Sequence, residues 1–263
     1  MRYESTRGQS GNRSFSDVLL DGMASDGGLY VPVELPLLSE ATLRGFADKP
    51  VVEVATGVMW PFVAPEFEPD EFAELVARSY DSFDHPDVAP LRVLDPGRGE
   101  WLLELFWGPT LAFKDVALQL LGNLFERELA KRSRAVTIIG ATSGDTGSAA
   151  IEAVRGREGI ELFMLHPHGR VSEIQRLQMT TADDSNIHNV AIEGTFDDCQ
   201  DLVKAMFADT GFRERHALSA VNSINWARVM AQTVYYVTAA VRLGGGSSQV
   251  AFSVPTGNFG NIY

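Results

Sequence analysis

Residues 135–148 read AVTIIGATSGDTGS, an apolar run followed by a turn of small polar residues. Residues 135–141 carry no charge and are rich in β-branched side chains, which predicts a strand that is buried on both faces. We expect a helix over residues 146–155 and a second strand over residues 160–165. Strand, helix and strand in this order are typical of a parallel sheet covered by helices.

The same alternation continues through the rest of the chain. It predicts strands near residues 187–192, 217–221 and 249–254, and helices near residues 172–179, 197–209 and 225–242. In the last helix apolar residues recur at steps of three and four, so we expect Trp226 and Met230 to be core residues. The predicted fold class is therefore α/β, with parallel sheets flanked by helices. Ligands of such sheets bind beyond the carboxyl ends of the strands.

The first 85 residues have a different character. Pro and Gly are scattered through them, and helical patterns occur near residues 39–47 and 70–82. We therefore predict a small, mainly helical N-terminal domain over residues 1–85 and an α/β region over residues 86–263.

Composition excludes several classes of function. The chain has 22 basic and 35 acidic residues, so its net charge is -13, which opposes binding to nucleic acid or to an anionic membrane. A single cysteine, Cys199, rules out an internal disulfide, and no metal site is predicted because the five histidines lack ligand spacing. The first 17 residues contain no apolar run of secretory length, so we expect a cytoplasmic protein.

Lys114 is the first candidate for chemistry. It lies in the segment GPTLAFKD (residues 108–115), where we expect it to begin a helix after an apolar stretch. Desolvation at such a position lowers the pKa of a lysine and makes the neutral amine available for Schiff-base formation. The alternative is a surface lysine whose stem packs and whose amine reaches water.

A glycine-containing segment near the end of the chain is the second candidate. Residues 256–261 read TGNFGN and follow a β-rich run, so their backbone N–H groups can form a cup for a phosphate at the start of a helix. The segment lacks the Lys-Ser/Thr of a P-loop, and the chain contains no G-x-G-x-x-G. An ordinary strand-to-helix turn is the alternative.

Two further strand-to-helix junctions carry polar groups. The hydroxyl-rich turn of residues 142–147 can bind a substrate carboxylate, or Ser143 or Asp145 can simply cap the following helix. Residues 222–228 place Arg228 in the first turn of a helix, where the dipole disfavours a cation, so we expect an anionic partner there. A surface salt bridge is the alternative.

Taken together and in this order, these segments resemble the pyridoxal-phosphate enzymes of the tryptophan-synthase-β fold type (fold type II), and among them the threonine synthases. The N-terminal runs YESTRG (residues 3–8) and DGGLYVP (residues 26–32) are similar to the small leading domain of that family. Residues 141–148 and 222–236 are similar to its active-site segments, so the resemblance covers essentially the whole chain.

The resemblance implies the roles of individual residues. Lys114 would carry pyridoxal 5'-phosphate as a Schiff base and shuttle protons, while the phosphate of the cofactor would lie among Gly257, Asn258, Phe259, Gly260 and Asn261. Asp145 would face the cofactor ring or the substrate. Ser143 and Thr146 would meet the substrate carboxylate, and Asn222, Ser223 and Arg228 would receive the substrate phosphate.

The implied reaction converts O-phospho-L-homoserine and water into L-threonine and phosphate. A serine or threonine dehydratase or a cysteine synthase would share Lys114 and the glycine cup, although the N-terminal domain and Arg228 favour the synthase. A catalytically silent threonine-synthase-like protein that binds a small molecule or a partner is a further alternative. In this family the group that meets the pyridine nitrogen comes from beyond position 263, so we expect the C-terminal part of the fold to be missing from this sequence.

Overall fold

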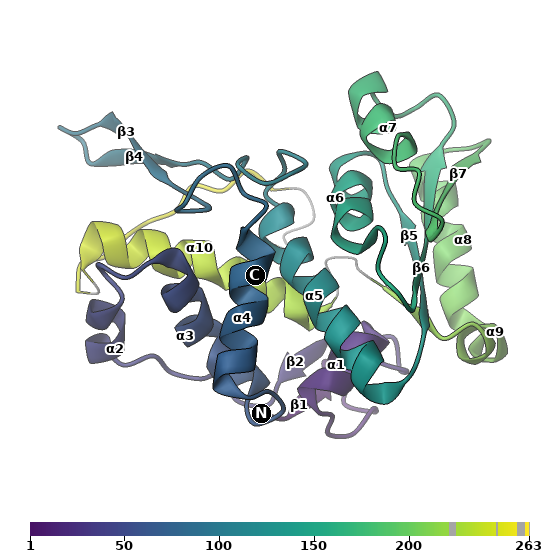
Figure 1. Cartoon of the computed structure of the whole chain (residues 1–263), viewed down its shortest axis with the longest axis horizontal. Coiled ribbons are helices and arrows are strands. Elements are labelled where there is room, and N and C mark those ends of the chain that lie inside the picture. Colours follow the sequence, from purple (N-terminus) through teal and green to yellow (C-terminus); the bar gives the residue numbers. More distant parts are fainter. Residues whose placement is uncertain (221–224, 246, 257–260, 263) are drawn as a thin grey trace.

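The computed structural model describes residues 1–220, 225–245, 247–256, 261 and 262. Helices of the N-terminal part pack beside a parallel sheet that has helices on both of its faces (Figure 1). The predicted α/β fold class, with a mainly helical N-terminal part, is thus confirmed. Within the described residues no helix is long and apolar enough to cross a membrane.

The N-terminal part contains four helices and one small antiparallel sheet. Its elements are β1 (Tyr3–Ser5), α1 (Phe15–Asp21), β2 (Tyr30–Pro32), α2 (Glu40–Gly45), α3 (Val51–Val63) and α4 (Pro69–Tyr80). The helices predicted near residues 39–47 and 70–82 are present as α2 and α4. α3 was not predicted, because Pro61, a residue type that normally interrupts helices, lies inside this largely buried helix.

A long-range contact fixes the start of α1. The carboxylate of Glu66, which follows α3, accepts hydrogen bonds from the backbone N–H groups of Phe15 (2.6 Å) and Ser16 (2.9 Å). Free N–H groups and the positive end of the dipole favour an anion at this position. Glu66 therefore holds α1 against the other N-terminal helices.

A hairpin and a long helix connect this part to the sheet. The hairpin consists of β3 (Leu91–Asp95) and β4 (Glu100–Leu103), which are antiparallel and largely exposed. The long helix is α5 (Asp115–Arg132), which is buried over most of its length. It ends at Ser133, which adopts a left-handed conformation (φ 49°) and turns the chain into the sheet.

The four strands of the main sheet are parallel, in the order β7-β6-β5-β8. They are β5 (Val136–Ala141), β6 (Ile160–Pro167), β7 (Ile187–Ile192) and β8 (Leu218–Ser219), and the helices between and after them are α6 (Asp145–Val154), α7 (Glu173–Thr180), α8 (Phe196–Ala208), α9 (Thr210–Arg215) and α10 (Trp226–Gly244). The first three predicted strands and all four predicted helices of this region are confirmed. The strand predicted over residues 217–221 is shorter, and Val221 lies outside the described residues.

The strand predicted over residues 249–254 is wrong, because these residues form no regular structure. Phe252 packs edge-on against Tyr236 of α10, with 4.9 Å between the ring centroids, but it stays 41% exposed. A strand requires a neighbouring strand to take its backbone hydrogen bonds, and no described strand pairs with these residues.

Two hydrophobic clusters hold the molecule together. The larger cluster extends across residue 85, since it joins α1, α3 and α4 to α5, α6 and α10. Trp226 and Met230 belong to it, as predicted, and the ring of Trp226 lies 6.2 Å from that of Tyr3. The smaller cluster lies beneath α8 and contains the fully buried Cys199.

Candidate active site

Lys114 lies at the N-cap of α5, where it emerges from the loop of residues 108–113. Its side chain is 15% exposed, whereas the side chains of Lys49 and Lys204 are 52% and 71% exposed, and Lys131 is also exposed. The ring of Phe113 covers the amine, whose Nζ is 4.7 Å from the ring centroid. Of the four lysines in the sequence, Lys114 alone is thus withdrawn from solvent.

Asp115 holds the loop that leads to the lysine. Its fully buried carboxylate accepts hydrogen bonds from the backbone N–H (2.8 Å) and the hydroxyl (2.6 Å) of Thr110. A side chain at Gly108 would overlap that of Asp115, so the loop must pass close to the carboxylate. Burial raises the pKa of Asp115, and the bonds from Thr110 lower it. Because Asp115 follows Lys114 directly, this contact fixes the direction in which the lysine leaves the helix.

Asp145 is the ion-pair partner of Lys114. It is the first residue of α6, and its Oδ2 lies 3.3 Å from Nζ of Lys114. Its other oxygen accepts a hydrogen bond from the side-chain amide of Gln175 on α7. The amine therefore faces the N-terminus of α6, beyond the carboxyl end of β5.

The turn before α6 is organised by Thr142, which the sequence analysis did not assign. Its hydroxyl oxygen accepts hydrogen bonds from the backbone N–H groups of Gly144 and Gly147, each at 3.0 Å. The alternative that Ser143 or Asp145 caps the helix is wrong, since Gly144 is the N-cap and the first-turn N–H of Gly147 is taken by Thr142. Ser143 is exposed on this turn and Thr146 is partly buried beside it.

Arg228 lies in the first turn of α10 and is 3% exposed. The alternative reading of a surface salt bridge is therefore wrong. Burial lowers the pKa of Arg228 to about 10. The turn before it is held by Asn225, which accepts a hydrogen bond from the N–H of Ala227 (3.0 Å) and donates one to the carbonyl of Leu19 (2.9 Å).

The electrostatics of the site lower the pKa of Lys114. Desolvation is the main cause that lowers its pKa, and the positive charge of Arg228 lowers it further. The carboxylates of Asp145 and Asp115 act in the opposite direction, but the net shift is downward. A neutral lysine amine is a nucleophile for carbonyl groups and a base for a nearby proton.

Several predicted residues cannot be placed. Asn222, Ser223, Gly257, Asn258, Phe259 and Gly260 lie outside the described residues. Asn261 is described, and its carbonyl accepts a hydrogen bond from the hydroxyl of Tyr236 on α10. Its side-chain oxygen also accepts a hydrogen bond from Thr256 (2.7 Å). These two contacts join both ends of the glycine segment to each other and to α10.

The structure thus brings Lys114, Asp145 and Arg228 into one electrostatically coupled group, with Ser143 and Thr146 on the adjacent turn. Asp115, Thr142 and Gln175 are the contributions that the sequence analysis missed. The hydrogen bonds between Thr110 and Asp115 have one sequence signal, which is a threonine five residues before an aspartate that adjoins Lys114. Within the described residues no group of three or more His, Cys, Asp or Glu side chains could hold a metal ion.

Comparison with family models gives two matches. Residues 2–80 match the model described as "Threonine synthase N terminus". Residues 90–263 match the model described as "Pyridoxal-phosphate dependent enzyme".

Individual relatives agree with these matches. The threonine synthase of Pseudomonas aeruginosa is 58% identical over 263 residues, which are 100% of this chain and 56% of the relative. The threonine synthase of Schizosaccharomyces pombe is 49% identical, over 99% of this chain and 52% of its own length. The crystal structure of a PLP-bound threonine synthase from Brucella melitensis superimposes with a TM-score of 0.93 at 52% identity, covering 100% of this chain and 56% of the other. The chain therefore spans about half the length of the relatives that it matches.

Proposed function

The chain belongs to the pyridoxal-phosphate dependent enzymes, and we propose that it acts as a threonine synthase, converting O-phospho-L-homoserine and water into L-threonine and phosphate. The observation that carries the proposal is the environment of Lys114. Its amine is the one lysine amine withdrawn from solvent, and the pKa of this amine is lowered. It also lies between the N-terminal turns of α6 and α10, where an anionic cofactor and substrate would be stabilised.

The residues present fit pyridoxal 5'-phosphate. Lys114 would hold it covalently through its amine. The backbone of Gly257, Asn258, Phe259, Gly260 and Asn261 would hold its phosphate. When bound, the cofactor supplies an electron sink for carbanions of the substrate.

Asp145 and Gln175 have a positioning role in this proposal. Asp145 accepts hydrogen bonds from both Lys114 and Gln175, so it can direct the amine toward the cofactor pocket before the cofactor binds. Once the amine is engaged, the same carboxylate is free to accept a hydrogen bond from a hydroxyl of the ligand. A ligand can reach this carboxylate, because the side chain of Asp145 is 48% exposed.

The remaining assignments concern the substrate and the proton. Arg228, with Asn222 and Ser223, would bind the substrate phosphate, and a buried guanidinium with a positive charge is suited to a dianion. Ser143 and Thr146 would bind the substrate carboxylate. Lys114 Nζ, in its neutral form, would take up and return the protons of the substrate carbons.

We also propose a cytoplasmic location, which the single and fully buried Cys199 supports.

Release of phosphate from O-phospho-L-homoserine tests the proposed reaction. We expect phosphate and threonine in equal amounts with the wild-type protein and with Lys204→Ala, which changes an exposed lysine, and neither product with Lys114→Ala. Conversion of serine without release of phosphate from phosphohomoserine would instead identify a dehydratase. Threonine formation by Lys114→Ala would refute the role of the lysine.

A further inference from the structure

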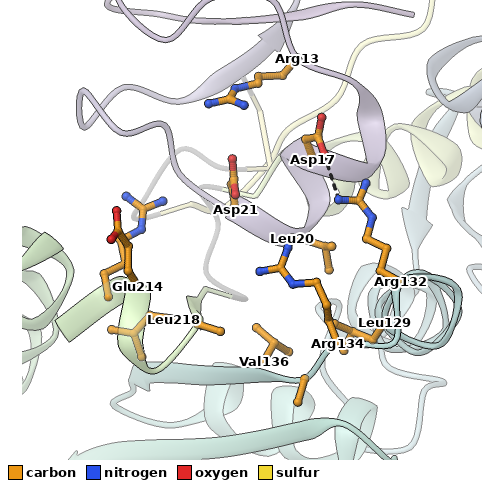
Figure 2. Close-up of a pocket in the computed structure, with 13 residues that line it drawn as sticks. Arg13, Asp17, Leu20, Asp21, Leu129, Arg132, Arg134, Val136, Glu214 and Leu218 are labelled. Atoms are coloured by element: carbon orange, nitrogen blue, oxygen red, sulfur yellow. Dashed lines mark hydrogen bonds and ion pairs between the residues drawn. The ribbon is translucent and has the colours of Figure 1, made fainter. Parts of the chain in front are cut away.

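A cavity of about 370 Å³ lies apart from the candidate active site, between α1, the C-terminal end of α5, α9 and the first residues of β5 and β8 (Figure 2). It lies at the amino end of the parallel sheet, because Val136 and Leu218 are the first residues of their strands. Lys114 and Asp145 lie beyond the carboxyl ends. The six residues of β5 separate the two places by about 17 Å at ~3.3 Å per residue, so the cavity is a different site.

Arginines dominate the lining of this cavity. Its charged residues are Arg13, Arg132, Arg134 and Arg213, together with Asp17, Asp21 and Glu214. The lining therefore carries an excess of positive charge in a chain whose net charge is -13. Arg13 and Arg134 reach the cavity from opposite sides, with Asp21 between them (Figure 2).

Only part of this positive charge is neutralised by contact. Arg132 pairs with Asp17 at 3.0 Å, and Arg213 donates a hydrogen bond to the carbonyl of Met23 at 3.1 Å. Within the described residues, Arg13, Arg134 and Arg213 form no ion pair at contact distance with a carboxylate. The Nε of Arg13 is buried and has no hydrogen-bond partner there.

The three acidic residues reduce the positive potential of the cavity but do not cancel it. Burial raises the pKa of Asp21, although the charges of Arg13 and Arg213 act against this shift. The charges of Arg13 and Arg213 therefore act on Asp21, although neither arginine forms an ion pair with it at contact distance. An arginine offers a planar fork of donors that matches carboxylate and phosphate oxygens.

We propose that this cavity binds a small organic dianion, a phosphate monoester or a dicarboxylate, through Arg13, Arg134 and Arg213. The volume lies at the lower end of the range of small-molecule pockets, about 300 to 1,000 Å³. Apolar side chains complete the lining and would contact the carbon skeleton of the ligand; they are those of Leu20, Leu129, Val136 and Leu218. A ligand here would bridge α1 to the end of α5 and to the sheet.

Arg134→Gln is the variant that tests the proposal. Arg134 is exposed, and its side chain forms no hydrogen bond or ion pair with another described residue, so we expect the substitution to leave the fold intact. Arg215→Gln is the matched control, because Arg215 is also exposed and lies on α9 but does not line the cavity.

The measurement is isothermal titration of the protein preloaded with pyridoxal phosphate, with glycerol 3-phosphate, succinate and neutral glycerol as probes. We expect at least one dianion to bind where glycerol does not, with an affinity about tenfold weaker in Arg134→Gln and unchanged in Arg215→Gln. The two dianions distinguish a phosphate ligand from a dicarboxylate. Equal affinity in the wild type and in Arg134→Gln is the result expected for binding at the candidate active site, and it would overturn the proposal. Failure of both dianions to bind would overturn it as well.

Discussion

Replacing Asp115 by alanine tests how the lysine is positioned. The substitution removes the two hydrogen bonds from Thr110 and leaves that N–H and hydroxyl without this partner in a partly buried loop. A hydrogen bond to a charged group contributes about 1.5 to 3 kcal/mol. Because burial of the carboxylate offsets part of the gain, we expect a total loss of about 3 kcal/mol in the free energy of unfolding.

This loss can be measured by thermal or urea unfolding. For a chain of this size about 3 kcal/mol corresponds to a fall in Tm of roughly 6 to 12 °C. Asp115→Asn should lose much less, since the amide oxygen can still accept the N–H of Thr110. Asp197→Ala removes an exposed acid from the first turn of α8 and should cost under about 1 kcal/mol.

The effect should also reach the cofactor. With the loop released, Lys114 loses its fixed direction, so we expect slower covalent attachment of pyridoxal phosphate in Asp115→Ala than in Asp115→Asn at temperatures where both variants are folded. The reasoning would be refuted if Asp115→Ala were no less stable than Asp197→Ala, or if alanine and asparagine gave the same attachment rate.

Three further predictions follow from other contacts. Asp145→Asn should lower the pKa of Lys114 further, because it removes a negative charge that raises this pKa. The pH dependence of acylation of Lys114, followed by mass spectrometry, measures the shift, and an upward shift would contradict the assignment. Gly122→Ala should destabilise the protein by about 1 to 3 kcal/mol in urea unfolding, because the added methyl group overlaps the carbonyl oxygen of Ala153 where α5 crosses α6, and an unchanged midpoint would contradict this close contact. Glu66→Ala should cost about 1 to 3 kcal/mol by unpairing the first N–H groups of α1, with hydrogen exchange at these two amides as the direct readout, and unchanged protection would show that the carboxylate is dispensable.

Periodicity alone predicted most of the α/β region. Strands such as β5 and β6 are largely continuous apolar runs, because burial by neighbouring strands and helices dictates their composition. Residues 249–254 are also rich in apolar side chains, yet they form no strand and are largely exposed. An apolar run does not show which partner takes the backbone hydrogen bonds.

The short N-terminal strands and α1 were not predicted from the sequence for another reason. β1 and β2 have three residues each, and α1 is completed by Glu66, about 50 residues away. Ser14 caps α1 locally, but elements this short depend on tertiary contacts as well.

The candidate site was predictable where a residue type was unusual for its position. Lys114 after an apolar stretch and Arg228 in a first helical turn both gave such a signal; Arg228 is buried, and Lys114 is 15% exposed. Thr142 gave none and Asp115 only its spacing from Thr110, because an acid or a threonine near a helix start is ordinary. Only the packing of the loop shows that their side chains organise the site.

Reductive trapping of the cofactor tests the central claim most directly. The protein is incubated with pyridoxal phosphate, reduced with borohydride, digested and sequenced by mass spectrometry. Since the sequence contains four lysines, the label can be assigned without ambiguity. We predict that the pyridoxyl mass is found on Lys114 and is lost in Lys114→Ala. A label distributed over the exposed lysines, with none on Lys114, would contradict the account.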